Sequence, residues 1–219
     1  MVLDMAGTTI RDDGLVEAAV SIAVDRVEPG RVVSEADFVQ ARGKPKRDLF
    51  DVLFPNDEAA SAAALEFFEG AMLDAATRGP ARAVAGAEDA IRDLKLRGSK
   101  VVLTTGFNDA IARALVRTEG WTDLVDAVVT PGVDVRGRPY PDMILTALMR
   151  THASDVRRVA VCGDTVSDLE AGNRSGAGFV AGVLNGAHSR DRLETANNTA
   201  LLDSVSALPD ALLQHPGSA

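Results

Sequence analysis

The stretch RRVAVCGDTVSDLEAGNRSGAGFVAGV (residues 157–183) decides the fold class of this chain. Residues 157–165 and 178–183 are apolar runs that predict buried strands, and residues 167–176 between them predict a helix. Two buried strands joined through one helix are typical of a parallel sheet with helices on both faces. Strand and helix patterns alternate in the same way from residue 87 onward, so the sequence predicts an α/β fold.

The chain before residue 80 has a helical pattern instead. Apolar residues recur at helix spacing on one face at Val16, Val20, Ala23 and Val27. The alanine-rich residues 58–76 predict another helix, and no convincing strand pattern accompanies these helices. We therefore expect an α/β core of residues 1–13 and 81–219, interrupted by an all-helical segment of residues 14–80.

Composition and charge exclude several classes of function. The formal net charge of −9 opposes a nucleic-acid surface, because phosphate contacts need clustered Lys and Arg. Cys162 is the only cysteine, which excludes an internal disulfide and a multi-cysteine zinc site. No apolar run approaches the roughly 20 residues of a bilayer span, and the start of the chain lacks the features of a signal peptide. We expect a cytoplasmic protein with no nucleic-acid or membrane partner.

Polar side chains follow the predicted strands at the point where each strand ends. Asp4 ends the first apolar run, Thr105 and Gly106 end the second, and Asp164 ends a third, with Asp168 four residues later. Parallel sheets bind ligands at the carboxyl ends of their strands. Three carboxylates at one crevice repel one another unless a cation lies between them, and oxygen ligands suit Mg²⁺. Only three residues precede Asp4, so we expect either a native start farther upstream or a short first strand.

Other residues of the same motifs offer partners for an anion beside that metal. Thr105, Gly106 and the Gly7–Thr8 turn supply hydroxyl and backbone N–H donors, and Arg138 adds a fixed positive charge. Each motif also has an ordinary structural interpretation as a turn, a solvated loop charge or a helix N-cap. Their joint order along successive strand ends favours a functional site.

The four motifs resemble, in order, those of the haloacid dehalogenase superfamily of aspartate-nucleophile hydrolases. They read VLDMAGT at residues 2–8, VVLTTG at 101–106, GRPYPD at 137–142 and GDTVSD at 163–168. The resemblance covers nearly the whole chain and implies a Rossmann-like core, with the helical segment as an inserted cap domain. It also implies that this chain catalyses phosphoryl transfer through an aspartyl-phosphate, as those hydrolases do.

The resemblance also assigns a role to each matching residue. Asp4 is the nucleophile, Thr105 binds a phosphoryl oxygen, and Arg138 neutralises charge on the nucleophile and the phosphoryl group. Mg²⁺ is held by Asp4, the backbone carbonyl of Ala6 and Asp164, with support from Asp168. Clamping of phosphoryl oxygens by such groups is the electrostatic work that phosphoryl transfer requires.

Ala6 distinguishes this chain from most phosphatases of the superfamily. Phosphatases of the superfamily usually have a second aspartate at this position, which protonates the departing alkoxide. Loss of a positioned acid typically costs about 10² to 10⁴ in rate. The phosphonatase subgroup, similar to phosphonoacetaldehyde hydrolase, has alanine there and cleaves a P–C bond after a cap lysine forms a Schiff base with the substrate aldehyde. Aligned on Gly43, that lysine falls on Lys46 in the loop ARGKPKRDLF (residues 41–50).

Two interpretations of Lys46 remain open, since related capped phosphatases also carry a basic residue in this loop that gates or binds substrate. Arg42, Lys44 and Arg47 add positive charge that favours a neutral, nucleophilic amine. The chain departs from phosphonatase in having Leu49 in place of a histidine, Arg42 in place of a methionine and Phe107 in place of a tyrosine. His188 is expected after the last core strand, near the crevice rim.

We therefore predict a Mg²⁺-dependent hydrolase of a small phosphonate or phosphate, with C–P cleavage of phosphonoacetaldehyde as one reaction. One alternative is a phosphomonoesterase of the phosphoglycolate phosphatase type. An alternative of another class is a catalytically weak metal- and phosphate-binding protein that acts by interaction. The oligomeric state stays open, although relatives of this type often form a homodimer through the cap.

Overall fold

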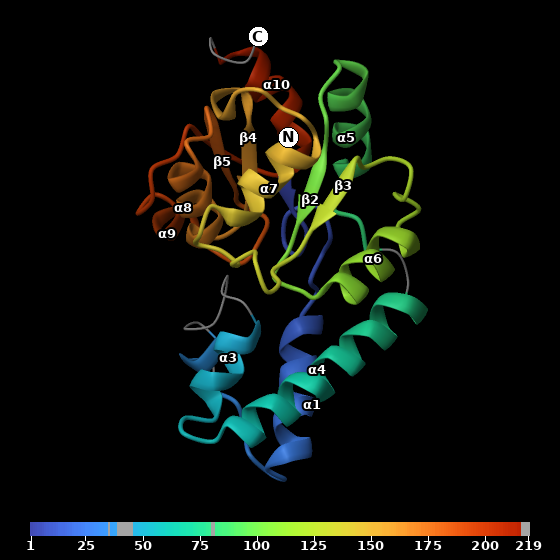
Figure 1. Cartoon of the computed structure of the whole chain (residues 1–219), viewed down its shortest axis with the longest axis vertical. Coiled ribbons are helices and arrows are strands. Elements are labelled where there is room, and N and C mark those ends of the chain that lie inside the picture. The colour runs from blue at the N-terminus through green and yellow to red at the C-terminus, as the bar shows by residue number, and fades with distance from the viewer. Residues whose placement is uncertain (35, 39–45, 80–81, 216–219) are drawn as a thin grey trace.

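A parallel sheet forms the centre of the computed structural model, which describes residues 1–34, 36–38, 46–79 and 82–215. Within this part of the chain the sheet has six strands in the order β3-β2-β1-β4-β5-β6. The strands are β1 (Val2–Asp4), β2 (Val102–Thr104), β3 (Ala127–Val129), β4 (Ala160–Gly163), β5 (Phe179–Val183) and β6 (Ala200–Leu202). All neighbouring strands pair in parallel, so their carboxyl ends meet at one edge (Figure 1).

Helices cover both faces of the sheet because alternate strand residues are apolar on both sides. One face packs on α5 (Ala87–Leu96), α6 (Asp109–Thr118) and α10 (Leu208–Leu213), and the other on α7 (Asp142–Arg150), α8 (Val166–Ser175) and α9 (Arg190–Leu193). In β1, Leu3 belongs to the first of these cores and Val2 to the second. The predicted Rossmann-like α/β core is confirmed.

The last strand was not predicted from the sequence, which placed the end of the sheet at residues 178–183. Strand β6 pairs with β5 at the edge of the sheet, where only Leu202 of its three residues is buried. Three residues are too few to show a periodic pattern, and an edge strand buries fewer side chains than a central one. The short helix α10 after it also gave no signal.

Helices α1 (Leu15–Val27), α3 (Lys46–Leu53) and α4 (Glu58–Arg78) pack together below the sheet in the view of Figure 1. The rings of Phe50 on α3 and Phe68 on α4 lie 5.7 Å apart between centroids, and both side chains are fully buried. Helix α4 begins where Asp57 accepts a hydrogen bond from the Ala60 N–H at 2.9 Å. The division into a core and a cap at residues 14–80 stays a prediction.

The two chain segments that connect these helices to the sheet lie side by side. Ile10 and Ala83 form an antiparallel bridge, and the Arg11 N–H donates to the Arg82 carbonyl at 2.7 Å. The Glu119 carboxylate accepts hydrogen bonds from the backbone N–H groups of Arg82 and Ala83, at 2.5 and 3.0 Å. The helices are therefore held to the sheet by paired backbone and by a carboxylate of α6.

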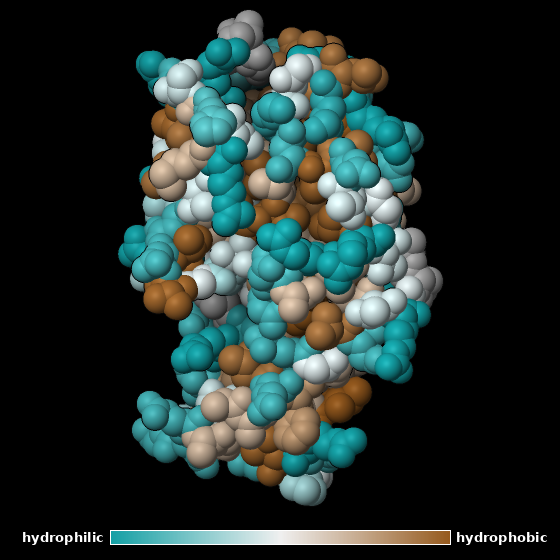
Figure 2. Space-filling view, turned by 45° about the vertical axis from the view of Figure 1, so that its right-hand side comes forward, coloured by the Kyte–Doolittle hydropathy of each residue, from teal (hydrophilic) through white to brown (hydrophobic). Residues whose placement is uncertain are grey.

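Hydrophilic residues cover most of the face seen in Figure 2, with hydrophobic side chains between them in separate patches. Exposed apolar residues include Ile22, Phe67 and Leu73 on the three-helix segment. Among the described residues, no helix has the length and apolar character needed to cross a membrane.

Replacement of Phe68 by alanine tests the packing of the three helices. Phe68 is fully buried against Phe50, so Phe68→Ala should lower the free energy of unfolding by about 3–5 kcal/mol, measured by urea titration. Phe67 lies next to it on α4 but is 47% exposed, so Phe67→Ala should cost less than about 1 kcal/mol. Equal losses in the two variants would contradict the packing described here.

Candidate active site

The predicted site residues meet at the carboxyl edge of the central strands. Asp4 is the last residue of β1, Thr105 follows β2 and Asp164 follows β4, and β1 pairs with both of the other strands. A cavity of about 610 Å³ lies between this edge and helices α1 and α3. Asp4, Thr105 and Asp164 line it together with Arg138 and Lys46, so tertiary structure joins residues from five separate segments.

Three carboxylates lie together at the sheet edge of the site. Asp4, Asp164 and Asp168 are buried, and each offers an oxygen within 4.8 Å of the others. Burial raises the pKa of Asp4 well above its ordinary value, although the Arg138 guanidinium lowers it. Burial, with the nearby Asp168 charge, raises the pKa of Asp164 to about 6. The site therefore holds more negative charge than its surroundings balance.

Arg138 joins two of these carboxylates. Its Nη1 donates to Asp4 Oδ1 at 2.7 Å and also to Asp168 Oδ1, and its side chain is 11% exposed. The two carboxylates raise the pKa of the guanidinium against the opposing effect of burial, so it stays charged. Arg138 is thereby fixed beside the carboxylate of Asp4 rather than solvated in its loop.

The first motif turns sharply so that its backbone passes over Asp164. Gly7 has φ of +89°, and a Cβ at this position would lie 2.2 Å from Asp164 Oδ2. Thr8 is fully buried, and its hydroxyl donates to Asp164 Oδ1 at 3.4 Å while its N–H donates to the Met5 carbonyl. Thr8 is not among the residues that line the cavity, so its hydroxyl is seen here as a partner of Asp164, and its predicted contact with substrate stays a prediction. Gly7 lines the cavity as expected.

Asp168 lies behind the cavity floor rather than in its lining. Its Oδ2 accepts hydrogen bonds from the Thr165 N–H at 3.0 Å and the Thr165 hydroxyl at 2.6 Å, and its Oδ1 accepts from Arg138. The residue thus forms the capping box at the start of α8 and positions Arg138. The ordinary N-cap interpretation of GDTVSD is therefore correct, while the support that Asp168 gives to a metal stays a prediction.

The second motif contributes a hydroxyl and a glycine to the cavity wall. The Thr105 Oγ1 accepts a hydrogen bond from the Phe107 N–H at 3.2 Å, which fixes the hydroxyl and leaves its proton to be donated. Gly106 lines the cavity next to it. Both residues therefore line the cavity, and their contact with a ligand stays a prediction.

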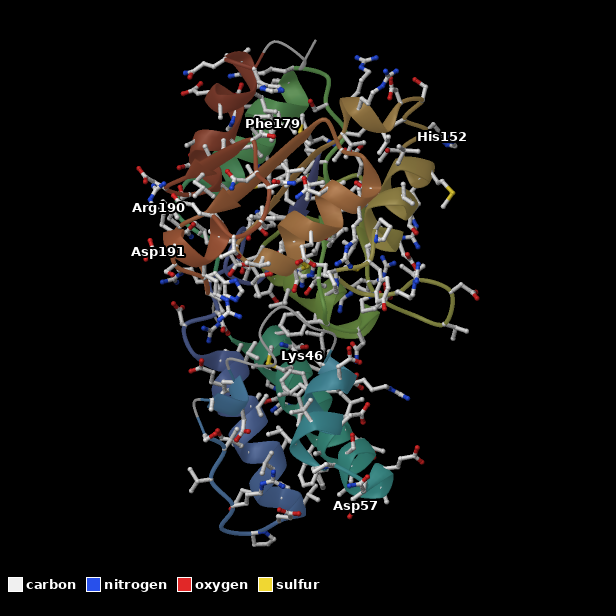
Figure 3. All side chains as sticks on the ribbon, turned by 90° about the vertical axis from the view of Figure 1, so that its left-hand side faces the viewer. Lys46, Asp57, His152, Phe179, Arg190 and Asp191 are labelled. Atoms are coloured by element: carbon white, nitrogen blue, oxygen red, sulfur yellow. The ribbon has the colours of Figure 1, made fainter. Side chains whose placement is uncertain are left out.

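Lys46 reaches the same cavity from α3, of which it is the first residue. Figure 3 shows it at the end of the three-helix segment that faces the sheet. Its Nζ lies 5.8 Å from the centroid of the Phe107 ring. Burial lowers the pKa of Lys46 to about 8, and the Arg138 charge adds to this effect. Arg42, Gly43 and Lys44 of the same loop lie outside the described residues, and Arg47 is exposed.

A loop after β5 completes the site and was missed by the sequence analysis. The Ala187 N–H donates to Asp164 Oδ2 at 2.7 Å, and a Cβ at Gly186 would lie 2.2 Å from the Asp164 Cβ. His188 is buried rather than at the rim, and its Nδ1 accepts from the Val166 N–H at 3.0 Å. The only sequence signal was the Asn185–Gly186 pair directly after a strand, which also predicts an ordinary turn.

The residues present fit a divalent cation. Three carboxylates and one guanidinium leave a net charge of −2, and the potential ligands are all oxygen atoms. The Gly7 turn lets backbone approach Asp164 more closely than a side chain would permit, and Ala6 beside it lines the cavity. Burial raises the pKa of both Asp4 and Asp164, and the neighbouring carboxylates add to this effect, so a bound cation would favour their charged forms.

The relatives of known sequence include a protein that matches over nearly its whole length and others that match in part. The chain is 25% identical over 216 residues to "Probable phosphatase IndB" of Dickeya dadantii, covering 96% of this chain and 92% of that protein. It is 30% identical over 105 residues to the phosphonoacetaldehyde hydrolase of Bacillus cytotoxicus, covering 46% of this chain and 39% of that enzyme. The match to this phosphonoacetaldehyde hydrolase thus spans less than half of either protein.

Solved structures share the fold. A hydrolase from Pseudomonas syringae superposes with a TM-score of 0.83 at 19% identity, covering 97% of both chains. A phosphonoacetaldehyde hydrolase-like protein from Oleispira antarctica gives 0.81 at 22% identity, covering 97% of this chain and 90% of that one. The family model described as haloacid dehalogenase-like hydrolase matches residues 1–176, which include all four motifs. The chain therefore belongs to the haloacid dehalogenase-like hydrolases and is an enzyme of that family.

Proposed function

We propose that this hydrolase acts on a small phosphonate or phosphate through an aspartyl-phosphate on Asp4, with Mg²⁺ as its cofactor. Asp4 ends β1 at the cavity floor, and Arg138 holds one of its carboxylate oxygens at 2.7 Å. Asp4, Asp164 and the Ala6 carbonyl would hold the metal. A bound divalent cation supplies charge neutralisation of the phosphoryl oxygens.

The reaction takes place in two steps, formation of the aspartyl-phosphate and its hydrolysis. An oxygen of the Asp4 carboxylate attacks phosphorus and forms an O–P bond while the bond from phosphorus to the leaving group breaks. The Thr105 hydroxyl and Arg138 bind the phosphoryl oxygens, where negative charge is spread in the transition state. Water then cleaves the acyl phosphate, which releases phosphate and restores the carboxylate of Asp4.

The position of Lys46 carries the proposal that the broken bond is P–C. The amine lies in the cavity that Asp4 lines, and its pKa of about 8 leaves a substantial neutral fraction near pH 7.5. A neutral amine condenses with the substrate carbonyl to form an imine and water. The electron pair of the P–C bond then moves into an enamine, which takes up a proton and is hydrolysed. No acid is needed at Ala6, because the leaving carbon is stabilised by the imine.

The alternative of a phosphomonoesterase of the phosphoglycolate type is favoured by one observation. The relative that matches over nearly the whole chain bears the name of a probable phosphatase. In that reaction Lys46 binds the substrate instead, and water or the substrate replaces the acid that Ala6 lacks. The cytoplasmic location stays a prediction. The formation of a homodimer also stays a prediction.

The nucleophile is tested by Asp4→Asn, which removes the attacking oxygen's charge and keeps its size. Phosphate release with Mg²⁺ should fall below about one thousandth of the wild-type rate. Asp123→Asn is the matched control, because Asp123 is exposed and lies outside the cavity lining. Retained turnover in Asp4→Asn would contradict the role of Asp4. Absence of turnover by the wild type on every phosphonate and phosphate tried would favour a protein that only binds metal and phosphate.

The metal role of Asp164 is tested without any substrate. Mg²⁺ should raise the melting temperature of the wild type over that in EDTA, because a ligand that binds only the folded state stabilises it. Asp164→Ala removes one of the clustered carboxylates, so its melting temperature should respond to Mg²⁺ only weakly. A response as large as that of the wild type would place the metal elsewhere. Asp123→Asn should respond like the wild type.

Lys46 is tested by borohydride trapping with phosphonoacetaldehyde, followed by mass spectrometry of the peptide that contains Lys44 and Lys46. A reduced adduct is expected on Lys46, and it should be absent from Lys46→Arg but present in Lys100→Arg. Lys100 is the control because it is exposed and pairs with Asp126 away from the cavity. Ester hydrolysis without any adduct would assign the protein to the phosphomonoesterases.

The pH dependence of trapping gives a second readout. Because the pKa of Lys46 is lowered to about 8, the neutral amine increases as pH rises through this value. Adduct formation should therefore rise from about pH 7 and level off above about pH 9. A lysine amine in a model peptide titrates near 10.4, so adduct formation at an unperturbed amine would continue to increase beyond that pH. The same late increase at Lys46 would show that its amine is not perturbed.

A further inference from the structure

The cavity is larger than a two-carbon substrate requires. At about 30 Å³ per water, its volume of about 610 Å³ corresponds to roughly twenty water molecules. A phosphoryl group bound at Asp4, Thr105 and Arg138 occupies only the end against the sheet. Phosphonoacetaldehyde adds a two-carbon aldehyde to that group, which leaves most of the space beyond Lys46 unfilled.

The two ends of the cavity differ in chemistry. The end at the sheet edge is polar and holds the carboxylates, the Thr105 hydroxyl and Arg138. Six apolar side chains also line the cavity, namely Val16, Val20, Phe38 and Leu49 from residues 14–80, and Val84 and Phe107 from the core. Apolar walls are favourable only for a ligand part that has apolar surface to bury.

Two of the apolar residues are tied to Lys46 by position, and the valines of α1 line the same cavity. Leu49 is three residues after Lys46 on α3, so the two side chains share one face of that helix. The Phe107 ring lies 5.8 Å from Lys46 Nζ, and Val16 and Val20 share a face of α1 in the same cavity. A carbonyl carbon bonded to this amine therefore carries its substituent toward an apolar wall.

Charged side chains also line the cavity, but they are held by partners within the chain. Asp12 and Asp13, just before α1, line it together with Arg11. Asp12 accepts a hydrogen bond from the Val16 N–H at 3.0 Å, and Asp13 pairs with Arg82 at 3.5 Å and with Arg11 at 3.7 Å. The apolar side chains are therefore the part of the lining that favours an uncharged substituent.

We infer that the substrate is a 2-oxo phosphonate whose carbonyl carbon carries an alkyl or aryl group, which binds against Leu49, Phe107 and the valines of α1. This inference rests on the proposed function and names its substrate class. The bonds broken and formed are those described above, with the enamine hydrolysed to a methyl ketone in place of an aldehyde. Leu49 and Phe107 are specificity-determining residues in this reaction.

The test compares substrates that differ only in this substituent. Phosphate release with Mg²⁺ is measured for phosphonoacetaldehyde and for 2-oxo-2-phenylethylphosphonate, and for the ester pair phosphoglycolate and 2-oxo-2-phenylethyl phosphate. The phenyl compound should have a kcat/KM at least about tenfold higher than its partner, the discrimination that an apolar pocket gives for added apolar groups. A higher kcat/KM for phosphonoacetaldehyde than for the phenyl phosphonate would overturn the inference and leave the proposed function intact.

A variant pair locates the preference in the cavity. Phe107→Tyr adds a hydroxyl beside Lys46 and should reduce the preference for the phenyl phosphonate by about tenfold. Phe67→Tyr makes the same chemical change at an exposed position on α4 and should leave the preference unchanged. Melting temperatures of both variants establish that they fold. An unchanged preference in folded Phe107→Tyr would overturn the assignment of this wall.

The ester pair separates this inference from the proposed P–C cleavage. Turnover of esters alone, with the phenyl ester preferred, would support the apolar wall for the leaving group but overturn the 2-oxo phosphonate as substrate. Turnover of esters alone, with phosphoglycolate preferred, would overturn both. Turnover of neither pair by the wild type would overturn the proposed function and the substrate class together.

Discussion

Negative charge confined at the carboxyl edge of the sheet is the constraint on which the site depends. Asp4 ends β1, Asp164 follows the neighbouring β4, and Asp168 lies in the first turn of α8, so that each offers an oxygen within 4.8 Å of the others. Arg138 offsets part of this charge through its bonds to Asp4 and Asp168. Burial and the neighbouring carboxylates raise the pKa of Asp4 and of Asp164, and the excess of negative charge fits a divalent cation.

The turn of the first motif and the loop after β5 both pack closely against Asp164. Gly7 and Gly186 both lie so close to Asp164 that a Cβ would be 2.2 Å from its side chain. Thr8 and Ala187 each donate a hydrogen bond to it. Much of the conformation of the first motif and of the loop after β5 thus serves to hold one buried carboxylate.

The helical segment adds a second kind of chemistry above this polar floor. It places an amine and apolar side chains opposite Asp4, so the cavity has a charged end and an apolar end. Burial lowers the pKa of Lys46, the change that an amine nucleophile needs. We propose that the core supports phosphoryl transfer in general, and that cavity residues of α1 and α3 decide which leaving group fits.

Sequence alone determined the alternation of strands and helices, the helices before residue 80 and the order of the four motifs. These features follow from local periodicity and from residues at strand ends, both of which are readable along the chain. It did not reveal β6, the burial of His188, the internal role of Thr8 or the placement of Asp168 behind Arg138. Those were decided only by tertiary structure, because each depends on contacts between segments far apart in the sequence, such as Arg138 with Asp4 and Ala187 with Asp164.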